Sequence, residues 1–400
     1  MTSEEVSWKG AATPLAATFA VQTLAAMVLF GVAVIAPVAA ADMGVDPTLI
    51  GTFTAIVYCF GMMAGLLTGA ATDRYGAIRI CQATMVFALL GTAVLTLSTP
   101  IAAIASAALI GLCYGPVNPA STHILARVSP ERWRPMIFSI KQTGMPAGSA
   151  AAGVLLPLLI VAYDWRVAIA TTGVLALLVA IFVQPLRPRL DTIRDGKRRL
   201  RIGDIVEPLK LVWREGDLRC LAIVSFTYSG CQVAITVFYV VYLTTVMEMS
   251  ITVAGLMFTL LQIGAVIGRL LWGSVADSVF PANLVLAWLG IATAVLSLVV
   301  GSFAPGWLVW AVGLVSFVMG ITSSGWNGVF FSELVKYSPA DETGEAASGV
   351  QFVIMAGVMT MPPLFGLLVT ASGGYFWAFA ATGLGMFAAA IYLMVRTRNR

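Results

Sequence analysis

The sequence predicts an all-helical integral membrane protein built from two homologous six-helix halves. Three observations support this fold class. Apolar residues make up 59% of the 400 residues and charged residues only 10%, about half the charged share of an ordinary soluble domain. Apolar stretches of about 20 residues, the length that a helix needs to cross about 30 Å of hydrocarbon, recur twelve times. Motifs of the first half also return in the second half.

The predicted spans begin near residues 15, 50, 78, 101, 136 and 165 in the first half and near residues 219, 252, 282, 307, 346 and 375 in the second. Their apolar runs are continuous rather than alternating. They therefore fit helices, which satisfy their own backbone groups in lipid, and not the strands of a barrel. The first run, Leu15 to Ala39, is too long for a signal-peptide core of about 7 to 15 residues. We expect it to remain as the first span.

The internal repeat consists of residues that match at nearly constant offsets. At an offset of 204, Gly69 and Asp73 match Gly273 and Asp277. At an offset of 209, the matched pairs are Asn118 with Asn327, Gln142 with Gln351, and Gly148 with Gly357. We therefore expect an N-terminal bundle at residues 1–184, a basic cytoplasmic linker at 185–218 and a C-terminal bundle at 219–400.

The basic residues predict the orientation of the spans. Of 23 Lys and Arg residues, twenty fall in segments on one side of the predicted spans, and only Arg166 falls on the other side. Positive residues accumulate in cytoplasmic loops. The sequence therefore predicts a multi-pass protein of the cytoplasmic (inner) membrane, with both termini in the cytoplasm. The two remaining cations, Lys141 and Arg269, lie inside predicted spans.

A motif joins the second and third spans: Gly69-x-x-x-Asp73-Arg74-x-Gly76-x-x-Arg79. Its small residues allow a neighbouring helix to approach, Gly76 suits a tight turn, and Asp73 can pair with a basic group or cap a helix. One interpretation is a cytoplasmic gating loop that latches when the two halves close. The alternative is a static turn whose arginines set the topology. The second copy keeps only Gly273 and Asp277, so a latch there would be weaker.

This loop resembles the signature loop of the major facilitator superfamily, and the resemblance extends along the whole chain. Twelve spans in two sets of six, the basic linker and the degenerate second copy of the loop all agree with it. The helix starts at Asp164-Trp165-Arg166 and Tyr375-Phe376-Trp377 are also similar. The resemblance implies two pseudo-symmetric bundles that rock around a central substrate site and expose it to each side of the membrane in turn. It implies no cofactor.

Lys141 and Arg269 need an explanation because a charge inside a bilayer costs about 2.5 to 3.5 kcal/mol. Arg269-x-x-x-Gly273 is similar to the helix 8 pattern of monocarboxylate and oxalate/formate-type carriers, where the arginine binds the substrate carboxylate. The alternative is a structural arginine that reaches Asp277 or the cytoplasmic interface. Lys141 could present a second positive charge to an anion, or its long stem could carry the ammonium out to the cytoplasm.

Polar and aromatic residues inside the spans complete the predicted substrate site. Amides there can bind substrate or join helices, and aromatic rings can line a cavity or pack. The candidates are Asn118, Gln142, Gln262, Asn327, Gln351, Tyr58, Tyr114 and Trp326. No Asp or Glu falls at the centre of a predicted span; Glu333, for example, lies near an inner end. A dedicated buried carboxylate that carries protons is therefore not evident.

These residues predict a secondary active transporter for a small organic anion such as a carboxylate, working by proton symport or anion exchange. The expected partners are the anionic substrate, protons as coupling ion and the lipid bilayer, with no nucleic acid, and the expected state is a monomer. Alternatives are an exporter of drugs or neutral solutes and a transporter-like membrane solute sensor. An enzyme is not expected, because the chain has no Gly-x-Ser-x-Gly, His-Glu-x-x-His or Walker motif. No metal site is expected, because the five cysteines lack metal-ligand spacing.

Overall fold

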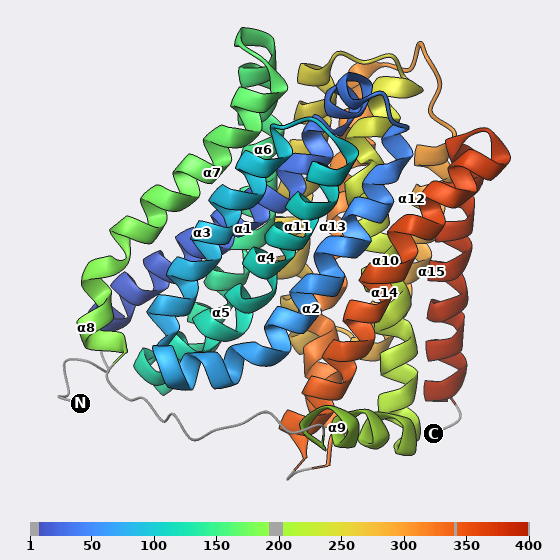
Figure 1. The fold of residues 1–400 in the computed structure, drawn as a ribbon. Coiled ribbons are helices and arrows are strands. Elements are labelled where there is room, and N and C mark those ends of the chain that lie inside the picture. Colours follow the sequence, from blue (N-terminus) through green and yellow to red (C-terminus); the bar gives the residue numbers. More distant parts are fainter. Residues whose placement is uncertain (1–7, 192–202, 340–341, 399–400) are drawn as a thin grey trace. The chain divides into compact units, whose positions relative to one another are not determined.

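The computed structural model describes residues 8–191, 203–339 and 342–398, apart from the side chains of residues 8, 9, 135, 203–205, 277, 278 and 398. These ranges contain twelve helical segments that are long and apolar enough to cross a membrane (Figure 1). Each begins within five residues of its predicted start. The chain divides into two compact units, one of residues 1–45 and 56–200, the other of residues 46–55 and 201–400. The predicted fold class is confirmed.

The first unit is formed by the first six spans. Its helices are α1 (Trp8–Met43), most of α2 (Ile50–Tyr75), α3 (Ala77–Leu95), α4 (Pro100–Val128), α5 (Arg134–Gln142), α6 (Gly144–Ala162), α7 (Trp165–Phe182) and the short α8 (Arg187–Leu190). Short 3-10 turns, Glu131–Trp133 and Gln184–Leu186, precede α5 and α8. Helix α1 packs on α6 and α7, and α3 packs on α4 and α7.

The second unit contains the other six spans. Its elements are the 3-10 turn Pro47–Leu49, α9 (Gly203–Arg214), α10 (Gly216–Thr245), α11 (Ile251–Ser278), α12 (Ala282–Gly301), α13 (Val309–Tyr337), α14 (Thr343–Ser372) and α15 (Tyr375–Arg398). Helix α10 packs on α14, and α12 packs on α13 and α15. These contacts match those of α1 with α6 and of α3 with α4 and α7, so the two units repeat one helix-packing scheme.

Equivalent glycines explain why the packing repeats. A Cβ atom at Gly148 in α6 would collide with the backbone carbonyl of Thr23 in α1. A Cβ atom at Gly357 in α14 would collide with the carbonyl of Phe226 in α10. Small residues let membrane helices approach backbone to backbone. The repeated glycine in the sequence therefore marks the same close helix contact in both units.

The fifth span is a broken helix. The segment Met136–Ala162 is long and apolar enough to span the membrane, but it consists of α5 and α6 joined at Thr143. Pro146 has no N–H to donate to the carbonyl of Gln142, so the regular hydrogen-bond ladder is interrupted there. The backbone N–H of Thr143 bonds to the carbonyls of Ser139 (3.2 Å) and Ile140 (3.1 Å). The break follows directly after Lys141 and Gln142.

The segment between the sixth and seventh spans contains described helices at both of its ends. Helix α8 packs on α3 in the first unit, whereas α9 packs on α14 and α10 in the second. In Figure 1, α9 lies across the ends of α10 and α14. The basic run at residues 194–201 lies in the part of the chain that is outside the described residues.

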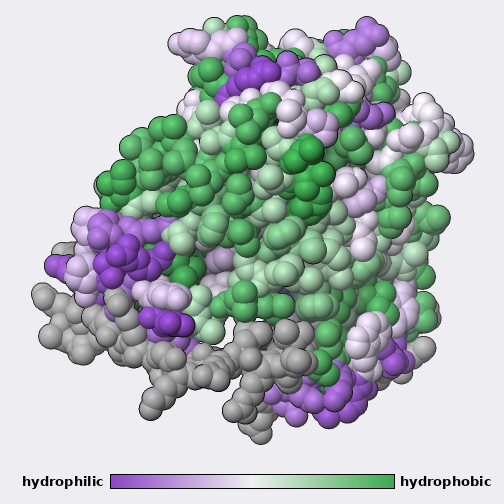
Figure 2. Space-filling view, viewed as in Figure 1, coloured by the Kyte–Doolittle hydropathy of each residue, from purple (hydrophilic) through white to green (hydrophobic). Residues whose placement is uncertain are grey.

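On the face shown in Figure 2, hydrophobic side chains cover the middle of the spanning helices, and hydrophilic ones gather towards their ends. Leu178 is 55% exposed and Leu384 is 69% exposed. In water such surfaces would be unfavourable, but against lipid tails they are not. The surface pattern therefore agrees with a protein embedded in a bilayer.

Candidate functional site

Lys141 lies in the last turn of α5, and its side chain is fully buried. Its Nζ donates a hydrogen bond to Oδ1 of Asn118 in α4. Asn118 is ten residues before the end of α4 at Val128, which corresponds to about 15 Å along the helix axis. The ammonium is therefore directed into the first unit, away from that end of α4. This geometry does not fit the alternative in which the stem carries the charge out to water.

The ammonium of Lys141 is only partly satisfied. It has three N–H donors, and within the described residues Asn118 is its one hydrogen-bond partner and no carboxylate forms an ion pair with it. Buried charges in proteins are normally paired or hydrogen-bonded, because removing them from water is costly. Lys141 thus retains donors that an anion could use.

Two tyrosines lie next to this pair. Tyr114 is one turn before Asn118 in α4, so both are on one face of that helix. The rings of Tyr58 in α2 and Tyr114 meet edge to face, with centroids 5.6 Å apart. The hydroxyl of Tyr114 donates to Sδ of Met145 in α6 at 3.7 Å. The structure therefore brings together Tyr58, Tyr114, Asn118 and Lys141.

Gln142 is joined to a residue that the sequence analysis did not single out. Nε2 of Gln22 in α1 donates to Oε1 of Gln142 at 3.0 Å, and Gln22 is 5% exposed. Its own Oε1 and the hydroxyl of neighbouring Thr23 are buried without a partner in the described part of the chain. Gln22 could have been found from the sequence, because it is an amide side chain inside the long apolar run of the first span. Gln22 and Gln142 extend the polar cluster of the first unit to α1.

In the second unit, Gln232 in α10 is the centre of a hydrogen-bond network that sequence reasoning also missed. Its Oε1 accepts from Nε1 of Trp326 at 2.9 Å and from Nδ2 of Asn327 at 3.5 Å. Its Nε2 donates to Oγ of Ser324 at 3.0 Å. Trp326 is 2% exposed and its ring meets Tyr228 edge to face. Trp326 therefore belongs to the packed core of this unit, while Asn327 beside it is half-buried.

The remaining candidates of the second unit lie apart from this network. Arg269 is half-buried in α11, and its backbone faces Gly328 of α13. Gln262, two turns earlier in α11, is 5% exposed, and Gln351 in α14 is half-buried. Among the described residues, no hydrogen bond joins Gln262 or Gln351 to another candidate. Lys141 and Arg269 do not occupy matching positions in the internal repeat. The residue that matches Arg269 in the first half is Gly65, and the residue that matches Lys141 in the second half is Val350.

The signature loop contains a tight turn at Gly76, as predicted. Gly76 has a φ of 96° between α2 and α3, a conformation that glycine adopts without strain. The cap of α3 comes from elsewhere in the chain. Asp191, after α8, accepts hydrogen bonds from the N–H groups of Ile78 (2.9 Å) and Arg79 (3.3 Å). A Cβ atom at Gly76 would collide with this carboxylate, so the glycine also makes room for the cap.

The other loop residues are distributed over the end of α2 and the start of α3. Asp73 is half-buried, while the side chains of Arg74 and Arg79 are exposed, and Arg74 lies over the ring of Tyr75 at 5.2 Å. A Cβ atom at Gly69 would meet no other atom within 4 Å. In the second copy, Gly273 and Asp277 both lie inside α11, and the side chain of Asp277 is outside the described residues.

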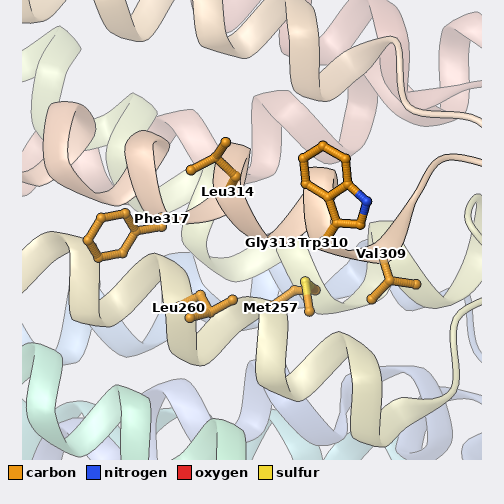
Figure 3. Close-up of a pocket in the computed structure, with 7 residues that line it drawn as sticks. All are labelled: Met257, Leu260, Val309, Trp310, Gly313, Leu314 and Phe317. Carbon is orange, nitrogen blue, oxygen red and sulfur yellow. The ribbon is translucent and has the colours of Figure 1, made fainter.

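A separate cavity of about 700 Å³ lies on the exposed side of α11 and α13 (Figure 3). Its lining residues are all apolar or glycine: Met257, Leu260, Val309, Trp310, Gly313, Leu314 and Phe317. Trp310 is 68% exposed and Leu314 is 56% exposed. None of the predicted site residues lines it. Its chemistry suits hydrocarbon chains rather than an anion.

Twelve membrane-spanning helices in two units of equivalent packing, with cations and amides inside the spans, are the features of a membrane transporter. A sequence profile of the Major Facilitator Superfamily matches residues 18–334. The chain therefore belongs to this superfamily of transporters. This agrees with the resemblance of the signature loop and with the expectation that the protein is not an enzyme.

Two curated relatives are organic anion transporters by name. A 4-hydroxybenzoate transporter of Pseudomonas aeruginosa is 28% identical over 173 residues, which cover 42% of this chain and 38% of that protein. The hexuronate transporter of Bacillus subtilis is 23% identical over 341 residues, which cover 80% of this chain and 79% of that protein. The match to the first relative thus spans well under half of its length.

Solved structures show the same fold at low sequence identity. A peptide transporter in complex with sulfate matches with a TM-score of 0.76 at 16% identity, covering 96% of this chain and 94% of that one. A bacterial homologue of the human lysosomal transporter Spinster matches with a TM-score of 0.74 at 13% identity, covering 96% of both chains. These similarities concern the fold.

Proposed function

We propose that this protein is a secondary active transporter that moves a small organic anion, and specifically a carboxylate, across the cytoplasmic membrane. Transport would proceed by alternating access, which is the mechanism that two pseudo-symmetric bundles permit. The proposed orientation has both termini in the cytoplasm, because the positive residues gather at the corresponding ends of the spans.

The observation that carries the proposal is the buried ammonium of Lys141. It lies inside a membrane span, its hydrogen-bond partner is the neutral amide of Asn118, and it is fully buried. An intramembrane cation that retains unused donors is a natural contact for an anion. Tyr114, one turn before Asn118 on α4, and Tyr58, whose ring meets that of Tyr114, would contact the apolar part of a small carboxylate. Gln142 with Gln22 would supply amide groups for polar substituents.

The relatives support the same substrate class. A 4-hydroxybenzoate and a hexuronate are both small carboxylates that also carry hydroxyl groups, and they differ in the aromatic or sugar body of the molecule. What two otherwise different substrates share is the charge that Lys141 would recognise. Arg269, on α11 of the second unit, is the second candidate cation, because its planar guanidinium can pair bidentately with a carboxylate.

Counterflow in proteoliposomes tests the proposal. The purified protein is loaded with unlabelled carboxylate, and entry of labelled glucuronate and 4-hydroxybenzoate is measured for wild type, Lys141→Met and Arg269→Ala. Loss of one charge-assisted hydrogen bond of about 1.5 to 3 kcal/mol corresponds to an affinity for the carboxylate that is about 10- to 150-fold lower. Lys210→Met is the control, because this lysine is 66% exposed on α9, outside the spans, and this variant should transport like wild type.

The result that contradicts the anion site is normal counterflow of a confirmed carboxylate by both Lys141→Met and Arg269→Ala. Transport of uncharged analogues at the same rate as the carboxylate would also contradict it, and would favour the alternative of a neutral-solute exporter. Binding without any counterflow in wild type would favour the solute sensor.

A further inference from the structure

We infer that the end of the second unit at which α10 begins and α15 ends binds the headgroup of an anionic phospholipid. The contacts come from Arg219 on α10 and Arg396 on α15. Both helices belong to the second unit, so the inference does not depend on the proposed substrate. The expected ligand is one phospholipid whose phosphate pairs with the two arginines and whose acyl chains lie along the two helices.

The packing of α10 on α15 brings the two arginines to one end of the helix pair. Gly216, the first residue of α10, lies against the end of α15, where Nη2 of Arg396 is 2.7 Å from the position of an added Cβ atom. About three turns earlier in α15, Gly385 faces Thr227, so the two helices run antiparallel (Figure 1). Arg219 follows Gly216 by three residues, about 4.5 Å along the axis. Both guanidinium groups therefore belong to the same end.

The two arginines carry charge that the described residues do not neutralise. Both are exposed, and within the described ranges neither forms an ion pair. The cations of α9 differ, because Lys210 pairs with Glu207 at 2.9 Å and Arg214 with Glu215 at 3.1 Å. Asp217, half-buried in the first turn of α10, has an interaction of its own. Two guanidinium groups thus remain available to an anion.

Exposed apolar side chains continue from the arginines along the same helix faces. Ile223 is one turn after Arg219 and is 37% exposed. On α15, Tyr392 and Val395 shortly precede Arg396 and are 39% and 56% exposed. Residues one turn apart share a helix face, and apolar faces of this kind suit acyl chains. Charge at the end of an apolar face fits a lipid better than a free anion.

The depth of Arg396 fits the headgroup layer. It lies 21 residues after Tyr375, where α15 begins, and this corresponds to about 32 Å along the axis. The hydrocarbon core of a bilayer is about 30 Å thick. Trp377, 63% exposed near the start of α15, marks the opposite boundary, because aromatic residues gather at membrane interfaces. Arg396 then reaches the phosphates on its own side.

The chemistry favours a headgroup with net negative charge. A guanidinium group can pair with two oxygens of one phosphate, and positive residues beside a membrane attract its anionic lipids. A zwitterionic headgroup would also bring an ammonium group, which two arginines repel. The two helices therefore select a lipid such as phosphatidylglycerol over phosphatidylcholine.

Native mass spectrometry of the full-length protein in detergent tests the site. The probes are phosphatidylglycerol, phosphatidylcholine with the same chains, and inorganic phosphate. Wild type should bind phosphatidylglycerol at least about tenfold more tightly than phosphatidylcholine. Arg219→Gln and Arg396→Gln should each lower the affinity for phosphatidylglycerol about fivefold, and the double variant about 30-fold.

The matched control is Lys210→Gln with Arg214→Gln. It also removes two positive charges at this end of the second unit, but from side chains that already have carboxylate partners. Its affinity for phosphatidylglycerol should stay within about threefold of wild type.

Unchanged binding of phosphatidylglycerol by the double arginine variant overturns the inference. An equal loss in the control also overturns it, because binding would then follow the total charge. Equal affinity of wild type for phosphatidylcholine contradicts the need for an anionic headgroup, and displacement of the lipid by an equal concentration of inorganic phosphate indicates a site for free anions instead. None of these results bears on carboxylate counterflow, so the two proposals fail separately.

Discussion

The cap on α3 makes a sharp prediction, because Asp191 lies far along the chain from the helix it stabilises. Its carboxylate is 6% exposed and accepts two hydrogen bonds from the first turn of α3. Asp191→Ala would leave both backbone N–H groups without a protein partner. Loss of a helix cap costs about 0.5 to 2 kcal/mol, and a hydrogen bond to a charged group contributes about 1.5 to 3 kcal/mol. Because these contributions overlap, we expect Asp191→Ala to lower the free energy of unfolding by about 2 to 3 kcal/mol.

Thermal unfolding of the detergent-solubilised protein measures this loss. For a unit of about 200 residues, each kcal/mol of lost unfolding free energy lowers the unfolding midpoint by about 2 to 4 °C. The midpoint of Asp191→Ala should therefore be about 4 to 12 °C lower than that of wild type. Asp191→Asn keeps an acceptor oxygen and should lose about half as much. Gly76→Ala alone should lower the unfolding midpoint, because it strains a positive φ and its Cβ atom collides with Asp191. When Asp191 is already replaced by alanine, Gly76→Ala should lower the midpoint by less, because only the backbone strain remains.

The reasoning is refuted if Asp191→Ala unfolds within 1 °C of wild type. It is also refuted if Gly76→Ala has the same effect with and without Asp191. Either result would mean that the carboxylate does not stabilise the start of α3.

The remaining predictions concern packing and the Gln232 network. Gly148→Val should prevent folding or lower the unfolding midpoint by more than about 5 °C, because its side chain would collide with the Thr23 carbonyl; folding of Gly148→Val at the wild-type midpoint would contradict the close helix contact. Gly69→Ala should unfold like wild type, because a Cβ atom there meets nothing within 4 Å; loss of transport with an unchanged midpoint would support a gating role for this loop. Gln232→Leu should lower the midpoint by about 2 to 10 °C, because the indole N–H of Trp326 loses its acceptor, and an unchanged midpoint would show that the network adds no stability.

Composition and repetition in the sequence predicted the architecture well. Lipid leaves few ways to satisfy a backbone, so each long apolar run must be a helix. Residue matches at offsets of 204 and 209 predicted two homologous halves, and the helix contacts of the two units repeat accordingly. Gly76 was predicted at a tight turn, because its place between two spans requires a residue that tolerates positive φ.

The candidate site could be predicted only in part, because side-chain direction depends on helix packing. Lys141 was open to two interpretations, and its contact with Asn118 shows only that the ammonium points into the first unit. Contact between Lys141 and an anion stays a prediction. Trp326 was a candidate for a cavity wall, yet its ring is packed in the core and its N–H is bound by Gln232. No local signal showed that Gln22 meets Gln142, since 120 residues separate them.

The sequence alone therefore determined the membrane class, the number of spans, the duplication and the presence of two intramembrane cations, because each is a property of composition or spacing. Only the tertiary structure decided which side chains meet. It placed the carboxylate of Asp191 at the start of α3 and broke the fifth span beside Lys141. It also buried Glu333, one oxygen of which has no hydrogen-bond partner among the described residues. The physical reason is that hydrophobicity acts on a segment as a whole, whereas hydrogen bonds and charge burial depend on atoms brought together from distant helices.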